Sequence, residues 1–272
     1  DLNLYRGCTH GCIYCDSRSD IYQLNHKFKD IEVKENAVEL LKREVIRRKP
    51  FMVVTGAMTD PYVPIEKRLK HVRKCLEVIY RYGYGFSCLT KSDLILRDLD
   101  LLKKINEKSK VVVQITLTTA DDDLCRLIEP NVCPTSRRVE VLERLNENGI
   151  PAVVWLSPIL PHINDSEENI NSILDYCIDT NVKGVLNLDM GFSLRKGNRE
   201  YFYKKLDENF PGLKDRYIDE FGDSNFIYSK NNRKLKGIIK DRCQRNGMLY
   251  KQEDIFDYVY EFPSNSVQSR LF

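Results

Sequence analysis

Short apolar runs rich in β-branched residues recur along most of this chain at intervals of roughly thirty residues, the length of one βα unit. Five of these runs are expected to form strands, at 51–57, 85–89, 111–118, 150–156 and 185–188. Helical patterns fill the intervals, at 35–48, 66–81, 94–107, 135–148 and 167–180. Strands that alternate with helices form a parallel sheet, because each helix carries the chain back to the same end of the sheet.

A further short strand around 2–5 brings the count to about six βα units. This number favours an α/β fold of the partial TIM-type barrel class, (βα)6, over a closed eight-stranded barrel. A doubly wound open sheet has the same periodicity and stays an alternative. We expect the barrel to occupy residues 1–194, and a mostly helical C-terminal extension that packs on it to occupy 195–272.

Composition limits the class of protein. With 272 residues, 42% of them hydrophobic, the chain can bury a substantial core. It contains no apolar run of the roughly 18 to 20 residues that a membrane span needs, and it does not open with a signal-peptide pattern. We therefore expect a cytoplasmic protein with no membrane contact, and a monomer.

The net charge of +3 is unevenly distributed. The segment 195–251 contains fifteen Lys and Arg against eight Asp and Glu, a net of +7, so the rest of the chain sums to −4. Aromatic residues are interleaved with these charges. Such a segment could track the phosphates of a nucleic acid and stack on its bases. Alternatively, its helices pack their aromatic side chains on the barrel and leave the lysines in solvent.

Cys8, Cys12 and Cys15 stand at C-x3-C-x2-C spacing, with Gly7 and Gly11 beside them. Glycines let a backbone wrap closely around a bound group, and soft thiolates select zinc or an iron–sulfur cluster. Three ligands on a cubane cluster leave one iron open to a small molecule.

A structural zinc site is the competing interpretation of these cysteines. His10 or His26 would supply the fourth ligand of a Cys3His site. The chain would then be a zinc-stabilised nucleic-acid-binding protein without catalysis.

Tyr14 precedes the third cysteine, giving C-x3-C-x-aromatic-C just after an expected first strand. This pattern resembles the radical S-adenosylmethionine superfamily. The resemblance implies a 4Fe-4S cluster on Cys8, Cys12 and Cys15, whose open iron chelates S-adenosylmethionine. It also implies a reductant such as flavodoxin or ferredoxin, and a 5′-deoxyadenosyl radical that abstracts hydrogen from a substrate.

Further segments are similar to the spore photoproduct lyase-like family, whose members are often labelled DNA repair photolyases. The likeness extends from about Tyr5 to Gly184 and includes the segments 56–61, 89–92, 115–119, 129–130 with Arg138, and 157–161. It implies DNA or RNA as the substrate, with a peptide or a small molecule as the alternative.

The same resemblance implies a set of residues that bind the cofactor. Lys91 matches a lysine that contacts the carboxylate of S-adenosylmethionine, and Thr116 replaces a serine that contacts the cofactor. Thr59 and Asp60 match positions near the methionine amino group. The remaining residues of the expected cofactor site are Tyr14, Thr118 and Arg138. Surface ion pairs for Lys91 and Arg138, and a turn before Pro61 for Asp60, stay alternatives.

One position departs from the family. Spore photoproduct lyases proper have a hydrogen-donor cysteine at the position matching Ala57, which has no thiol. The resemblance therefore assigns no catalytic residue beyond the cluster site. We expect the other six cysteines to be packing residues.

Overall fold

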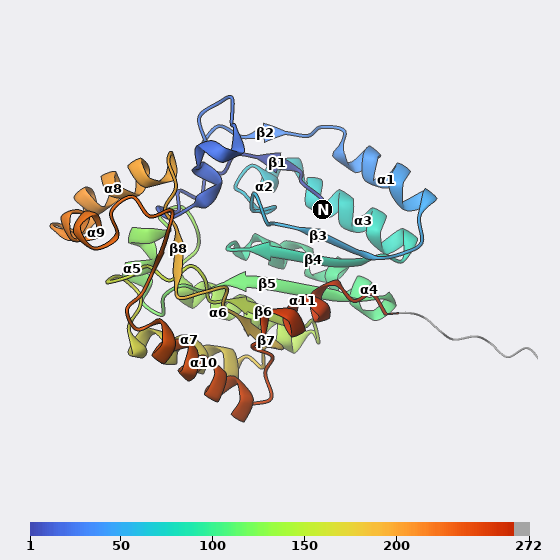
Figure 1. The fold of residues 1–272 in the computed structure, drawn as a ribbon. Helices are drawn as coiled ribbons and strands as arrows, with labels where there is room; N and C mark the ends of the chain where they lie inside the picture. Colours follow the sequence, from blue (N-terminus) through green and yellow to red (C-terminus); the bar gives the residue numbers. More distant parts are fainter. Residues whose placement is uncertain (264–272) are drawn as a thin grey trace, which may run out of the picture.

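The computed structural model describes residues 1–263, and a five-stranded parallel sheet forms its centre (Figure 1). Strand order follows the chain, β3-β4-β5-β6-β7. The bounds are Met52–Thr55 for β3, Gly85–Thr90 for β4, Val111–Thr116 for β5, Ala152–Trp155 for β6 and Gly184–Leu186 for β7. Each observed strand overlaps one of the five expected runs, so the expected α/β partial barrel is confirmed.

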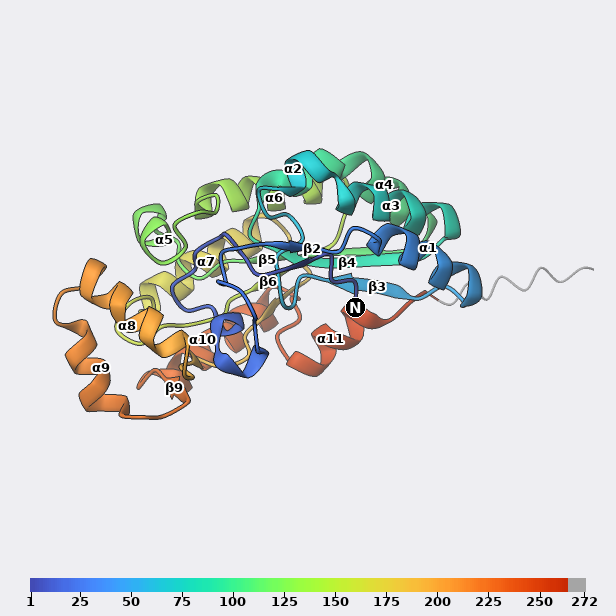
Figure 2. The same cartoon turned by 90° about the horizontal axis from the view of Figure 1, so that it is seen from above.

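Helices cover one face of this sheet. They are α1 (Ala37–Arg47), α3 (His71–Tyr82), α4 (Leu99–Lys108), α6 (Thr135–Glu147) and α7 (Glu167–Asp179). Figure 2 shows α3, α4 and α6 on one side of the strands. The helix expected over 66–81 is broken, because Lys70 takes a left-handed backbone angle (φ 54°) between α2 (Glu66–Leu69) and α3. A 3-10 segment, η3 (Asp93–Asp98), precedes α4, and α5 (Asp122–Ile128) follows β5.

The expected first strand does not join the parallel sheet. Leu2 runs beside β3 for one residue, where its N–H donates to the Val54 carbonyl at 2.8 Å. The chain then turns away, and β1 (Tyr5–Arg6) pairs antiparallel with β2 (Glu32–Val33). The parallel strands therefore number five rather than six, because the segment that would supply the sixth leads directly into the cysteine loop.

The C-terminal extension wraps around the barrel. Its elements are α8 (Asn198–Asn209), α9 (Leu213–Phe221), β9 (Phe226–Tyr228), α10 (Asn232–Arg245) and α11 (Gln252–Tyr260), and β9 pairs with β8 (Gly191–Ser193). Helix α11 lies on the face of the sheet opposite α3 and α4 (Figure 2). There Ile255 and Val259 pack against Val112, Val153 and Leu186.

Part of the positive charge of the segment 195–251 is paired with acidic residues elsewhere in the chain. Five cations of 195–251 form ion pairs with acidic residues that precede this segment, namely Arg195–Asp16, Lys196–Asp20, Lys234–Glu167, Lys236–Asp189 and Arg242–Asp175. Exposed pairs of this kind each contribute less than about 1 kcal/mol. Apolar packing, rather than these pairs, must therefore supply most of the free energy that holds the extension on the barrel.

No helix within residues 1–263 combines the length and the apolar character needed to cross a membrane.

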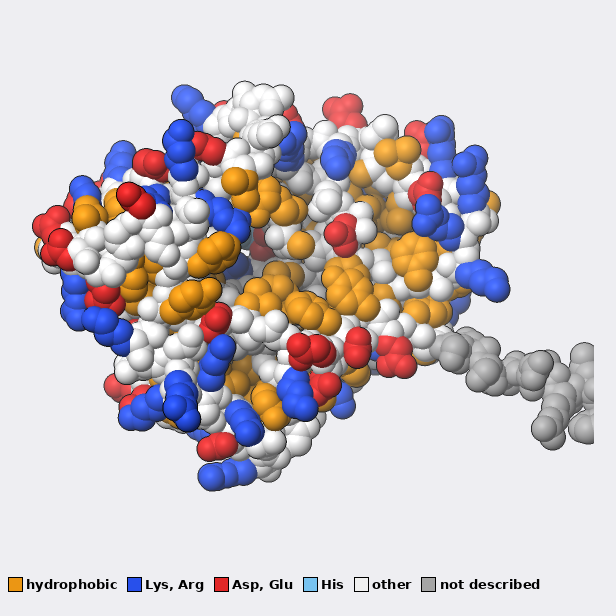
Figure 3. All heavy atoms as spheres, in the orientation of Figure 1, with side chains coloured by type: hydrophobic (Ala, Val, Ile, Leu, Met, Phe, Trp, Pro, Cys, Tyr) orange, Lys and Arg blue, Asp and Glu red, His pale blue; other side chains and the backbone are white. Residues whose placement is uncertain are grey.

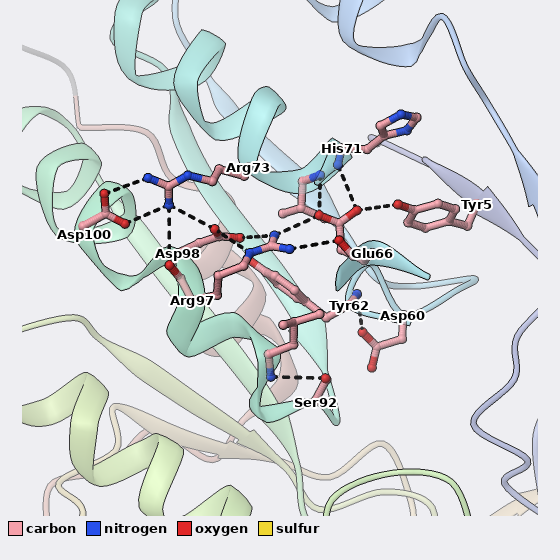
Figure 4. A network of polar contacts seen from close by, with 12 residues as sticks. Tyr5, Asp60, Tyr62, Glu66, His71, Arg73, Ser92, Arg97, Asp98 and Asp100 are labelled. Carbon is pink, nitrogen blue, oxygen red and sulfur yellow. Dashed lines mark hydrogen bonds and ion pairs between the residues drawn. The ribbon is translucent and has the colours of Figure 1, made fainter. Parts of the chain in front are cut away.

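A buried carboxylate ties β1 to the helices behind it (Figure 4). The Glu66 side chain is fully buried and accepts hydrogen bonds from the Tyr5 hydroxyl and from the backbone N–H of His71 at 3.0 Å. It also accepts a bond of 2.8 Å from Arg97, which reaches the buried Asp98 at 2.6 Å. This network fixes the strand that leads into the cysteine loop.

We predict that Glu66→Gln lowers the free energy of unfolding by about 3 kcal/mol, because the partly buried charge of Arg97 loses one carboxylate partner and the new amide NH₂ group lies against backbone N–H donors. Asp100→Asn is the matched control: Asp100 pairs with Arg73 at 2.9 Å but is 52% exposed, so we expect a loss below about 1 kcal/mol. Urea unfolding of both variants tests the prediction, and equal losses would contradict it.

Candidate functional site

The cysteine loop, residues 8–15, follows β1 and is fastened to the protein by backbone hydrogen bonds. The Cys8 N–H donates to the Phe28 carbonyl at 2.9 Å, and the Ile13 N–H donates to the Ile128 carbonyl at 2.9 Å. The His10 carbonyl accepts from the Asn131 N–H at 3.0 Å. Three bonds to two distant segments of the chain therefore set the path of the loop.

The two glycines of this region have left-handed backbone angles, with φ of +83° at Gly7 and +75° at Gly11. A Cβ at Gly7 would lie 2.5 Å from the Asp30 carbonyl oxygen. A Cβ at Gly11 would lie 3.0 Å from Asn131 Nδ2. The sequence suggested that these glycines make room for a bound group, whereas in the structure they make room for neighbouring loops.

The three cysteines of the loop are free thiols. Cys8 and Cys12 are buried, and Cys15 is partly exposed. Burial raises the pKa of Cys8 to about 12 and raises the pKa of Cys12 well above its usual value. Thiolate ligands at these two positions therefore need a positive group to replace the lost solvation, and iron ions supply such charge.

The two histidines that the sequence offered as a fourth zinc ligand both face acidic side chains. Among residues 1–263, no three side chains of His, Cys, Asp or Glu form a group that could hold one metal ion. His10, one of the two expected fourth ligands, points Nδ1 at Asp60 at 3.5 Å, and His26 points Nε2 at Glu32 at 3.5 Å.

A cavity of about 500 Å³ opens beside the cysteine loop at the carboxyl ends of the strands. Tyr14 and Cys15 line it from the loop, and Leu89, Thr116 and Trp155 line it from β4, β5 and β6. In Figure 3, hydrophobic side chains gather around a hollow near the middle of this face. Barrels of this type bind their substrates at this end of the strands.

Aromatic rings form part of the cavity wall. Phe226 and Tyr228 of β9 line it and remain 46% and 45% exposed. Trp155 is held by a hydrogen-bonded chain, in which its indole N–H donates to Gln114 at 2.6 Å and the Gln114 amide donates to Ser87 at 2.9 Å. Trp155 is partly buried and forms part of the cavity wall.

Three of the expected cofactor residues line this cavity: Tyr14, Lys91 and Thr116. The Lys91 ammonium lies 5.9 Å from the centre of the Tyr14 ring. Within residues 1–263, Lys91 takes part in none of the ion pairs, so its charge is available to an anionic group in the cavity.

Arg138 and Thr118 lie beneath the cavity rather than in its wall. Arg138 is 1% exposed, pairs with Glu129 at 2.5 Å and donates to the Thr116 carbonyl at 3.0 Å. Glu129 also accepts a hydrogen bond from the Tyr14 hydroxyl. Burial alone would raise the pKa of Glu129, but Arg138 and Lys91 outweigh it and hold the pKa below its usual range. Arg138 is thus half of a buried bridge between β5 and the cysteine loop, not a surface ion pair.

Asp60 and Thr59 also lie outside the cavity lining. Asp60 accepts a hydrogen bond from the Tyr62 N–H at 2.8 Å, the turn that the sequence allowed as an alternative. It further accepts from the Thr90 hydroxyl and from the Lys91 N–H, both at 2.8 Å. Asp60 therefore positions Lys91. Thr59 lines a separate cavity on the other side of the loop after β3.

Sequence reasoning assigned no role to Glu129, although Glu129-Pro130 was part of the resemblance. A lone glutamate at the end of a helical run has no local signal that distinguishes a buried partner from a solvated one. The side of the sheet on which Trp155 lies follows from strand alternation, because Trp155 shares a face with Val153, which packs under α11.

A third cavity, of about 340 Å³, lies at the opposite end of the strands, among residues 146–152, 180–183 and 246–248. Residues at this end of a barrel usually serve stability. We therefore place the functional site at the cysteine loop.

Residues 2–173 match the sequence profile of the Radical SAM superfamily. This chain belongs to the radical SAM superfamily. Membership implies an enzyme with a 4Fe-4S cluster and S-adenosylmethionine as cofactors. An uncharacterised protein of Methanocaldococcus jannaschii is 34% identical over 230 residues, covering 80% of this chain and 83% of that protein. An uncharacterised protein of Mycobacterium tuberculosis is 29% identical over 229 residues, and the match covers 79% of this chain and 65% of that protein.

Among solved structures, spore photoproduct lyase in complex with dinucleoside spore photoproduct superposes with a TM-score of 0.66 at 15% identity, covering 92% of this chain and 76% of that one. Streptococcus suis SuiB bound to the precursor peptide SuiA superposes with a TM-score of 0.53 at 14% identity, covering 89% and 47%. The resemblance to the spore photoproduct lyase-like family is thus confirmed in the fold.

Proposed function

We propose that this radical SAM chain holds its 4Fe-4S cluster on Cys8, Cys12 and Cys15 and uses it to cleave S-adenosylmethionine reductively. The observation that carries the proposal is the position of the cysteine loop, which opens through Cys15 onto a cavity of about 500 Å³. A cavity of this size is sufficient for a cofactor and part of a substrate. When bound and reduced, the cluster would supply the electron that breaks the C5′–S bond of S-adenosylmethionine, releasing methionine and a 5′-deoxyadenosyl radical that removes a hydrogen atom from the substrate.

The chain's own residues orient the cofactor. Lys91 is the cation that binds the carboxylate, because its ammonium lines the cavity without an ion-pair partner among the described residues. Thr116 presents its hydroxyl at the end of β5, and the Tyr14 ring lies beside the Lys91 ammonium. Asp60 and Arg138 act through their neighbours: they fix the backbone of Lys91 and of Thr116.

Anaerobic reconstitution with iron and sulfide tests the cluster assignment. We expect a brown protein that produces 5′-deoxyadenosine when reduced in the presence of S-adenosylmethionine. Cys12→Ala should abolish cluster assembly, whereas Cys75→Ala, which changes a buried thiol of α3, should leave iron content unchanged. Normal iron and sulfide in Cys12→Ala, or a colourless wild-type protein with stoichiometric zinc, would contradict the assignment.

For the cofactor, we predict that Lys91→Ala weakens S-adenosylmethionine binding roughly tenfold or more without loss of the cluster, because a charged hydrogen bond is removed. Equilibrium dialysis of the cluster-loaded protein against S-adenosylmethionine measures the dissociation constant. Lys104→Ala, on the exposed side of α4, is the control and should bind normally. An unchanged dissociation constant in Lys91→Ala would show that the carboxylate is held elsewhere.

The substrate that we propose for this site is a nucleic acid, DNA or RNA. Phe226 and Tyr228 present exposed rings at the cavity, and bases stack on such rings. The guanidinium of Arg195, which is paired with Asp16, lies 4.7 Å from the Phe226 ring centre and supports that ring from behind the wall. The fold is shared with spore photoproduct lyase, whose structure with dinucleoside spore photoproduct is consistent with this substrate.

We predict that Tyr228→Ala weakens binding of single-stranded DNA or RNA about tenfold, the loss expected for one stacked base. Fluorescence anisotropy at low and high salt measures the affinity, and Tyr80→Ala on the distant α3 is the matched control. Equal affinities of the two variants would remove β9 from the site. Absence of any binding at low salt would exclude nucleic acid and favour a peptide or a small molecule.

A further inference from the structure

The family profile ends at residue 173, yet much of the surface that covers the cysteine loop comes from later residues. Cys12, Ile13 and Tyr14 belong to one buried cluster with Phe202 and Leu206 of α8. In both Figure 1 and Figure 2, the blue N-terminal loop lies beside the orange α8. We call residues 194–202, which lead into and begin α8, the clamp segment.

Gly197 marks the closest approach of the clamp segment to the N-terminal region. A Cβ at Gly197 would lie 2.5 Å from Asp20 Oδ1 and 2.9 Å from Asp20 N. It would also lie 3.0 Å from the Arg18 carbonyl oxygen. The Asp20 N–H donates to the Lys196 carbonyl at 3.1 Å, so the two backbones are in direct contact. No side chain fits between them.

Arg18, three residues after Cys15, is held between two rings. Its guanidinium carbon lies 3.8 Å from the centre of the Tyr201 ring and 4.3 Å from that of Phe28. Phe28 is itself the residue whose carbonyl accepts the Cys8 N–H. The stacking of Arg18 between these two rings therefore connects α8 to both ends of the cysteine loop.

Two polar contacts complete the interface. Arg195 donates to the Asp16 carboxylate at 2.9 Å, and Asp16 directly follows Cys15. The Asn198 side-chain amide donates to the Ser193 carbonyl at 2.9 Å and to the Tyr14 carbonyl at 3.4 Å. The residues on either side of Cys15 are thus both bound by the clamp segment.

From these contacts we infer that the clamp segment is a structural part of the cluster site: it positions Cys12 and Cys15 and excludes water from the cluster. The inference rests on the proposed cluster of the preceding section. It assigns positioning roles to Gly197, Arg195 and Tyr201, which lie outside the region matched by the superfamily.

A consequence for redox properties separates this role from simple stability. The reduction potential of an iron–sulfur cluster depends on its exposure to solvent. Water stabilises the more highly charged reduced state of a cluster bound by three thiolates. Loosening the clamp segment should therefore raise the midpoint potential as well as hasten the loss of iron.

The test compares two glycines in matched positions. Gly197 precedes α8 with φ of +86°, and Gly212 precedes α9 with φ of +80°, but a Cβ at Gly212 would meet no atom within 4 Å. Both alanine variants therefore strain the backbone, and only Gly197→Ala displaces the N-terminal region. We expect the reconstituted Gly197→Ala protein to lose iron to a chelator roughly tenfold faster than wild type, with a raised midpoint potential. Gly212→Ala should match wild type in both measurements.

Tyr201 provides a second pair of variants in case Gly197→Ala folds poorly. Tyr201→Phe keeps the ring over Arg18 and should retain the cluster as wild type does, whereas Tyr201→Leu should lose iron faster. Equal rates and potentials across both pairs, in a wild-type protein that holds its cluster, would overturn the clamp alone. A wild-type protein that assembles no cluster would overturn the proposed function and the clamp together.

Discussion

The ion pair between Glu129 and Arg138 is the interaction on which the site depends. Both side chains are buried, so each charge needs the other as a replacement for water. Through Arg138 the pair holds the carbonyl at the end of β5, and through Glu129 it holds the Tyr14 hydroxyl. The cysteine loop is thereby fixed to the sheet by a bridge that runs under the cavity, which leaves the cavity face of Tyr14 free.

The charged residues near the cavity differ in how completely they are paired inside the protein. Asp60 and Arg138 form several hydrogen bonds inside the protein, whereas the Lys91 ammonium has no hydrogen-bond or ion-pair partner among the described residues. A cation that is already paired offers little to a ligand, because the new contact must replace an existing one. Of the two cations that the sequence suggested for the cofactor, the structure therefore favours Lys91 as the binding group and Arg138 as its support.

The fold was predictable where local pattern and tertiary structure agree. The strands and most helices of the barrel follow from hydrophobic periodicity, which burial enforces. The sequence did not predict those features of the fold that depend on contacts between distant parts of the chain. Leu2 pairs for one residue with Val54 and then leaves the sheet, and no local pattern records that departure. Lys70 breaks a continuous helical pattern so that Glu66 can reach Tyr5 and Arg97. For the basic segment, the sequence left open a nucleic-acid surface and packing on the barrel, and the structure shows that five of its cations pair with acidic residues earlier in the chain.

The residues that line the cavity also limit how a reaction there can end. Ala57 lines the cavity at the position where the resemblance to spore photoproduct lyases implies a cysteine, and Cys15 is the one thiol among the lining residues within 1–263. A cysteine that ligates iron has no S–H bond to donate. A reaction that finishes by hydrogen transfer from a protein thiol therefore does not fit this cavity. We expect the substrate radical either to recover a hydrogen atom from 5′-deoxyadenosine, or to give one electron back to the oxidised cluster and leave, after loss of a proton, as an oxidised product. In both cases the chain's contribution is a closed, correctly oriented cavity rather than a hydrogen donor of its own.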